Sequence, residues 1–80
     1  MNEKKNILIV DDRRSEVWFI DRILKKNGFL TDVAFSGAEG IRKAREGKPE
    51  LIIQDIVLPD MDGSLVYQQL REDAVAADQA

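Results

Sequence analysis

The sequence contains no cysteine and no histidine. Disulfide bonds and thiolate chemistry are therefore excluded, as are zinc sites built from Cys and His and a Ser-His-Asp catalytic triad. Long hydrophobic runs are also missing near the N terminus, where the apolar segment 7–10 is short. This segment is too short for a signal peptide or a membrane span, so we expect a cytoplasmic protein that does not associate with a membrane.

The excess of negative over positive charge is small as well. The chain has 12 Lys and Arg against 15 Asp and Glu, a net charge of −3 at pH 7. Nucleic acids and anionic membrane surfaces both attract basic segments, so we expect neither partner. The 80 residues, 44% of them hydrophobic, suffice for one small core. We therefore expect a single domain over residues 1–80, with the weakly patterned segment 74–80 as a loosely ordered tail.

Short apolar runs alternate along the chain with segments of helical periodicity, the pattern of βαβ units and a parallel sheet. The expected elements alternate strand and helix, over residues 7–10, 14–27, 30–35, 36–47, 51–57 and from 65 onward. With right-handed crossovers and a reversal of winding after the second strand, the sheet order becomes 2-1-3. The fold class is therefore α/β, with three layers. Of Trp18 and Phe19 in the first helix, one is expected to join the core and the other to lie at its rim.

Acidic residues stand where the first and third strands end. Asp11 and Asp12 follow the first strand, and Asp55 lies in the third, among apolar residues that disfavour a charge. In the order 2-1-3 these strands are neighbours, and open α/β sheets bind ligands at their carboxyl ends. Three converging carboxylates repel one another unless a hard cation lies between them, which predicts a Mg²⁺ site. The alternative is that Asp11 and Asp12 cap the first helix while Asp55 faces solvent.

A second acidic pair lies in the loop that follows the third strand. Asp60 and Asp62, followed by glycine, match the middle of a calcium-binding EF-hand loop. Leu58 and Gln69 would then occupy the first and last ligand positions, so the strongest ligands are missing. We interpret these two acids as ordinary solvated turn residues.

Two segments carry a more specific pattern. Residues 7–12 read Ile-Leu-Ile-Val-Asp-Asp, and residues 55–63 contain Asp-x-x-x-Pro-x-Met-Asp-Gly. Between them, Ser-Gly-Ala-Glu at residues 36–39 forms a capping box that predicts a helix start. In these segments and their spacing the chain resembles the receiver domain of bacterial two-component response regulators, and the resemblance covers nearly the whole chain.

The resemblance implies roles for individual residues. Asp55 would be the phosphoacceptor, phosphorylated by a sensor histidine kinase or phosphotransfer protein in a phosphorelay. Asp11, Asp12 and Asp55 would hold Mg²⁺, Asp12 most directly, and the backbone carbonyl of Val57 would complete the protein ligands. The metal would neutralise charge on the phosphoryl group, so that an anionic nucleophile can approach it. Such a domain relays a signal, so we do not expect an independent enzyme.

The chain departs from the family pattern after its third helix. In the family a Ser or Thr ends a fourth strand and a Lys ends a fifth, and Lys48 lies on the wrong loop to substitute. The resemblance therefore implies a truncated, partial flavodoxin-like receiver fold that lacks strands 4 and 5. Strand 3 would then be an exposed sheet edge, so we expect a homodimer through strand 3 or helix 3. The alternative function is a self-associating structural or interaction protein without productive phosphorylation.

Overall fold

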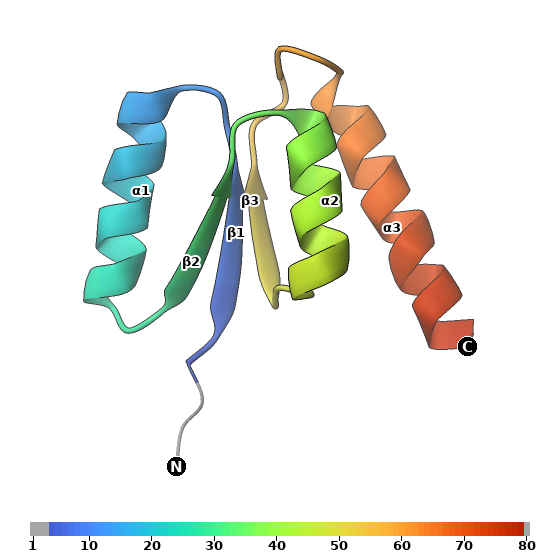
Figure 1. Cartoon of the computed structure of the whole chain (residues 1–80), viewed down its shortest axis with the longest axis horizontal. Helices are drawn as coiled ribbons and strands as arrows, with labels where there is room; N and C mark the ends of the chain where they lie inside the picture. The colour runs from blue at the N-terminus through green and yellow to red at the C-terminus, as the bar shows by residue number, and fades with distance from the viewer. Residues whose placement is uncertain (1–3, 80) are drawn as a thin grey trace.

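The structure of the chain, a computed structural model, describes the backbone of residues 4–79 and the side chains of residues 4–73. Strands and helices alternate in the order β1 (Asn6–Val10), α1 (Arg14–Lys26), β2 (Leu30–Ala34), α2 (Gly37–Gly47), β3 (Leu51–Gln54) and α3 (Gly63–Gln79). The three strands are parallel and lie in the order β2-β1-β3. Helix α1 lies on one side of the sheet, and α2 and α3 lie on the other (Figure 1). The predicted α/β fold and strand order are confirmed.

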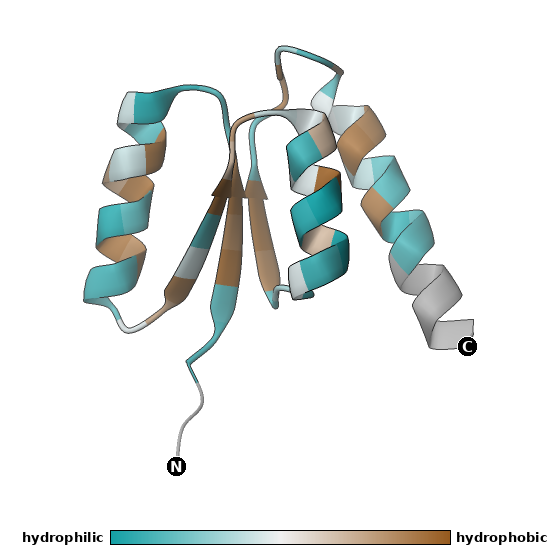
Figure 2. Cartoon of the chain, in the orientation of Figure 1, coloured by the Kyte–Doolittle hydropathy of each residue, from teal (hydrophilic) through white to brown (hydrophobic). Residues whose placement is uncertain are grey.

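The core is centred on β1, whose residues Ile7 to Val10 are at most 3% exposed. Successive residues of a strand point to opposite faces of the sheet. Leu8 and Val10 pack with Ala34 and Val66 in the cluster that also contacts α2 and α3. Both faces of this central strand are therefore covered, which explains its unbroken hydrophobic run (Figure 2).

Helix α1 turns fewer of its large residues toward the core than its sequence suggests. Val17 is buried, but Trp18 and Phe19 are each 60% exposed. The expectation that one of these aromatic residues joins the core is wrong. Successive helical residues are rotated by about 100°. Once Val17 faces the sheet, the two residues that follow it are carried round toward solvent.

Local hydrogen bonds and a glycine turn fix where α1 ends and where α2 begins. Gly28 has φ +87°, the left-handed conformation that glycine adopts without strain, and its N–H donates to the carbonyl of Lys25. The side chain of Ser36 accepts a hydrogen bond from the N–H of Glu39, as the capping box predicts. The Glu39 carboxylate reaches one residue further back than expected and accepts from the N–H of Phe35.

The third strand is shorter than predicted, because it ends at Gln54 and not at residue 57. Its partner β1 ends at Val10, and the last contact between them is the N–H of Asp55 donating to the carbonyl of Val10 at 2.8 Å. Beyond this point β1 offers no further residue to pair with, and Ile56 and Val57 are 74% and 75% exposed. Asp55 therefore follows the strand and does not lie within it.

Helix α3 continues as regular backbone to Gln79. The side chains from residue 74 onward lie outside the described part of the chain, and residue 80 lies outside it altogether. The loosely ordered tail over 74–80 therefore stays a prediction. None of the helices described over residues 4–79 is long and apolar enough to cross a membrane.

Candidate functional site

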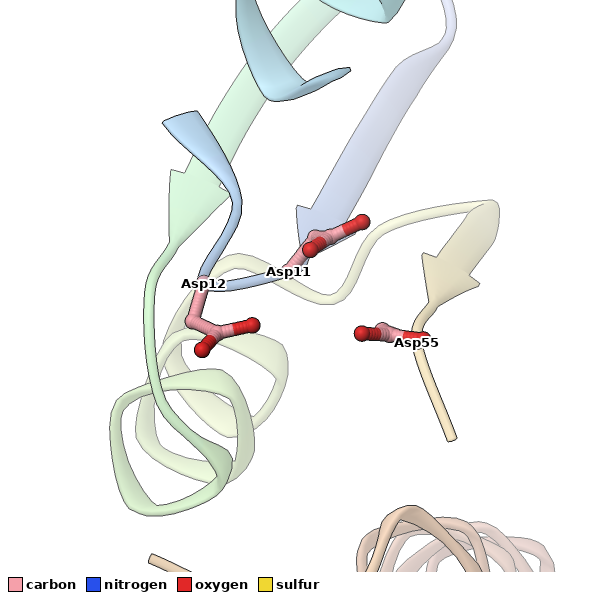
Figure 3. Close-up of side chains that lie close together, drawn as sticks. All are labelled: Asp11, Asp12 and Asp55. Carbon is pink, nitrogen blue, oxygen red and sulfur yellow. The ribbon is translucent and has the colours of Figure 1, made fainter. Parts of the chain in front are cut away.

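The carboxylates of Asp11, Asp12 and Asp55 come together where β1 and β3 end. One oxygen from each lies within 4.8 Å of the others. Asp11 is buried, Asp55 is half-buried and Asp12 is exposed, so the cluster opens to solvent on one side. Figure 3 shows the carboxylates of Asp12 and Asp55 pointing toward each other from the loops after the two strands. Because β1 and β3 are parallel neighbours, the residues that follow them lie together at the carboxyl end of the sheet.

Arg13 is the basic residue that contacts this acid pocket, which we define as Asp11, Asp12 and Asp55. Its Nε and Nη2 atoms donate to the two oxygens of Asp11, each at 3.3 Å. Nη2 also lies 2.8 Å from Oε2 of Glu16 and 3.7 Å from Oδ1 of Asp55. The hydrogen bond to Asp11 is the main cause that raises the pKa of Arg13 above its ordinary value. The guanidinium therefore offsets part of the negative charge of the pocket.

The alternative in which the first two acids cap a helix does not describe the observed contacts. The N-cap residue of α1 is Arg13, and no side chain of the described residues caps it by a hydrogen bond. Asp11 instead accepts the N–H of Arg13 at 2.9 Å, which forms a local turn before the helix. Asp55 does not simply face solvent either, since its side chain is only 20% exposed.

The loop after β3 is tied to the start of α2. The carboxylate oxygens of Asp60 accept the N–H groups of Gly37 and Ala38, at 2.7 and 2.9 Å. These backbone hydrogen bonds lower the pKa of Asp60. Asp62 caps α3 by accepting the N–H of Ser64 at 2.9 Å, which also lowers its pKa. Both acids are exposed turn residues, as predicted, but each one also fixes a helix start, a role that the interpretation as ordinary solvated residues missed.

Gly63 brings the start of α3 against the backbone of the candidate phosphoacceptor. A Cβ atom at this position would lie 2.5 Å from the carbonyl oxygen of Asp55 and 2.6 Å from that of Ile56. The N–H of Gly63 donates to the carbonyl of Ile56, and the side-chain amide of Gln54 donates to the carbonyl of Gly63. Only a residue without a side chain allows this close approach. The residues directly before and after Asp55 are therefore both hydrogen-bonded to the start of α3.

The donor set of the acid pocket suits a hard divalent cation. Its three carboxylates offer oxygen ligands, which Mg²⁺ prefers, and their mutual repulsion favours a cation between them. Val57, the fourth predicted ligand, lies in the loop two residues after Asp55 and forms an isolated bridge with Asp62. Its side chain is exposed, and its role rests on its backbone carbonyl alone.

Two residues at this end of the sheet were not predicted from the sequence. Arg13 directly follows the acidic pair, and a basic residue beside two acids is the signal that suggests a contact with them. Asp60 reaches amides more than 20 residues away along the chain, and its sequence neighbourhood carries no signal of that contact.

Comparison with known proteins places this arrangement in one family. A family profile described as the response regulator receiver domain matches residues 7–78. The alkaline phosphatase synthesis transcriptional regulatory protein PhoP of Bacillus subtilis is 41% identical over 85% of this chain, and protein PilH of Pseudomonas aeruginosa is 38% identical over 85%. The chain spans 28% of the length of PhoP and 56% of the length of PilH.

Solved structures agree with the sequence relatives. The receiver domain protein of Methanospirillum hungatei superposes with a TM-score of 0.86 at 31% identity, covering 88% of this chain and 56% of that one. The N-terminal receiver domain from Methanoculleus marisnigri gives 0.84 at 30% identity, covering 89% and 58%. The sheet order, the acidic strand ends and the profile match over 72 residues, 7 to 78, lead to one conclusion: the chain belongs to the response regulator receiver domain family.

Proposed function

We propose that this chain is the phosphoacceptor module of a two-component phosphorelay. In this proposal Asp55 accepts a phosphoryl group from a histidine of a sensor kinase or phosphotransfer protein, and the reaction depends on Mg²⁺. The observation that carries the proposal is the convergence of Asp11, Asp12 and Asp55, with oxygens within 4.8 Å of one another, in a chain of this family. A cytoplasmic location is part of this proposal.

The chemistry requires Asp55 to be an oriented nucleophile. Its carboxylate attacks phosphorus, a P–O bond forms, and the P–N bond to the donor imidazole breaks, leaving the electron pair on the ring nitrogen. The Oδ1 atom of Asp55 accepts the N–H of Ile56 at 2.8 Å, which restricts rotation of the carboxylate. The contact of Gly63 with the same peptide holds the backbone in place. Both contacts orient the carboxylate before a donor arrives.

The metal-binding residues in this proposal are Asp11, Asp12, the carboxylate of Asp55 and the backbone carbonyl of Val57. Bound Mg²⁺ supplies positive charge that offsets the charge of the phosphoryl oxygens. The half-buried setting of Asp55, whose side chain is 20% exposed, supports this role because an electrostatic interaction is stronger away from bulk water.

The test uses beryllofluoride with Mg²⁺ as an analogue of the aspartyl phosphate, followed by amide NMR shifts. We expect saturable shifts at residues 11–13 and 55–57 when beryllofluoride is added to the Mg²⁺-saturated wild type, beyond the shifts that Mg²⁺ alone causes, and none on the same addition to Asp55→Asn. Asp32→Asn is the matched control, because it removes the same charge from β2, where Asp32 pairs with Lys43. Equal responses from the wild type and Asp55→Asn would refute the proposal.

A second candidate function, self-association, is favoured by the outer edge of β3. In the described sheet β3 pairs with β1 on one side only. A groove between this strand and α3 has a mixed lining, in which Leu51, Ile52, Tyr67 and Leu70 lie beside Glu50, Gln54 and Arg71. Leu51 and Tyr67 are 53% and 60% exposed, and an edge of this kind can pair with a second copy.

Sedimentation velocity at micromolar to millimolar concentration distinguishes the two functions. Self-association through this edge predicts a dimer that Leu51→Lys converts to monomer and that Asp55→Asn leaves intact. A folded wild-type monomer across this range would exclude homodimer formation through β3 or α3. A dimer that responds to beryllofluoride would support both functions in one molecule.

A further inference from the structure

The guanidinium of Arg13 lies among the acid-pocket carboxylates, where a cation is expected. It contacts both oxygens of Asp11 at 3.3 Å, and its Nη2 atom is 3.7 Å from Oδ1 of Asp55. These two carboxylates come from different strand ends, so one side chain bridges the pocket. Arg13 thereby makes the kind of contact between acids that a divalent cation would make.

The oxygens of Asp11 have little capacity left for another partner. The carboxylate already accepts three hydrogen bonds from Arg13, one from its backbone N–H and two from its side chain. A carboxylate offers about four lone-pair sites. Mg²⁺ ligation needs an oxygen lone pair and a strict octahedral arrangement. The side-chain hydrogen bonds of Arg13 and a metal ion therefore compete for the same two atoms of Asp11.

Electrostatic repulsion, like hydrogen bonding, makes Arg13 and a metal ion compete for the pocket. A cation that ligated Asp11 and Asp55 would share both carboxylates with the guanidinium, and two cations at one carboxylate repel each other. Glu16 offers the guanidinium another partner at the shortest distance of the set, 2.8 Å from Nη2 and one turn along α1. The Glu16 side chain is 48% exposed, against 8% for that of Asp11. Arg13 can therefore leave the buried acid without losing all of its ion pairs.

We propose that Arg13 is a tethered cation that competes with Mg²⁺ for the acid pocket. The guanidinium offsets part of the charge of Asp11 and Asp55 in the metal-free protein and moves toward Glu16 when the pocket takes up the metal. This inference rests on the proposed function, because it takes the pocket to be the metal site. Arg13 acts here on metal affinity, and it lowers that affinity while it stays in place.

The experiment is a MgCl₂ titration of the full 80-residue chain at constant ionic strength, followed by the amide NMR signals of residues 11–13 and 55–57. We expect Arg13→Ala to lower the Kd for Mg²⁺ by about three- to tenfold, the range for losing two or three partly exposed ion pairs. Arg13→Lys keeps the charge and loses the planar fork, so its Kd should lie between the two. In the wild type, the Nε–H signal of Arg13 should shift with the same Kd as the pocket amides.

Arg14→Ala is the matched control, since it removes the same charge from the neighbouring residue. The Arg14 guanidinium lies over the ring of Phe35, 4.3 Å from its centroid, and no described contact joins it to the acid pocket. We expect its Kd to stay within about twofold of the wild type. Far-UV circular dichroism verifies that each variant is folded.

The outcomes separate this inference from the proposed function. If the wild type binds Mg²⁺ and Arg13→Ala binds it no more tightly, the inference is wrong and the proposed function stands. If Arg14→Ala gains as much as Arg13→Ala, the effect is one of net charge, and the inference is again wrong. If neither the wild type nor Arg13→Ala responds to Mg²⁺, the pocket is not a metal site and the proposed function itself fails.

Discussion

Replacing Gly63 by alanine tests the claim that α3 begins in direct contact with the peptide of Asp55. The added Cβ atom would lie 2.5 Å from the carbonyl oxygen of Asp55, 2.6 Å from that of Ile56 and 2.8 Å from the Cα of Ile56. All three atoms belong to the backbone, so rotating a side chain cannot relieve the overlap. Overpacking of this kind costs about 1–3 kcal/mol.

The gain in helix propensity does not cancel this cost. Alanine is better than glycine by roughly 0.5–1 kcal/mol inside a helix, but Gly63 is the first residue of α3, where the gain is smaller. In a domain of this size 1 kcal/mol shifts Tm by about 4–8 °C. We therefore expect Gly63→Ala to lower Tm by about 5–20 °C, measured by far-UV circular dichroism.

Gly47→Ala is the control for this measurement. Its Cβ would meet only the side-chain amide of Asn6, at an ordinary 3.8 Å, so we expect Tm to change by less than about 5 °C. Gly63→Ala should also weaken the beryllofluoride response, because the clash displaces the peptide of Asp55, whereas Gly47→Ala should not. A Gly63→Ala variant as stable as the wild type, with unchanged NMR shifts at Asp55, would refute the reasoning.

Three further predictions concern contacts around the sheet. Asp60 has a folded-state pKa below its ordinary value of 3.8, so its contribution to stability is present above about pH 4 and is lost as pH falls through the folded-state pKa. Asp60→Asn should therefore lower Tm at neutral pH, with a difference that closes in acid; a constant difference across the pH range would contradict this. Thr31→Val removes the hydrogen bond that lowers the pKa of Asp21. The variant should lose about 0.5–1.5 kcal/mol in urea denaturation, and NMR titration should show the Asp21 pKa rising. Lys48 has φ 45°, so Lys48→Gly should stabilise the fold by up to about 1 kcal/mol, whereas Lys48→Ala should not.

The strand order and the meeting of the acids could be predicted because they follow from pattern and handedness. The run 7–10 is apolar without alternation, which indicates a strand covered on both faces, and β1 is indeed central. Once β1 and β3 are parallel neighbours, the residues after them lie together at the carboxyl end of the sheet, so Asp11 and Asp55 meet. These inferences depend on backbone topology and need no knowledge of side-chain direction.

The contacts that depend on side-chain direction could not be predicted in the same way. Arg13 has a long side chain with many rotamers, and its position follows from carboxylates that only the folded sheet brings together. Asp60 binds amides at the start of α2, and this contact exists only because α2 and the loop after β3 lie at one end of the sheet. The end of β3 at Gln54 is set by where β1 ends, since the apolar pattern itself continues to Val57.

The three acids of the pocket differ in how firmly they are held, and this difference supports the individual roles proposed for them. Asp11 is 6% exposed and accepts three hydrogen bonds from Arg13, so its oxygens become ligands only after contacts are broken. Asp55 is oriented by the N–H of Ile56 and remains partly exposed. Asp12 is exposed, and its carboxylate points toward Asp55 (Figure 3). A cation arriving from solvent therefore meets Asp12 and Asp55 before Asp11, which favours Asp12 as the most direct metal ligand.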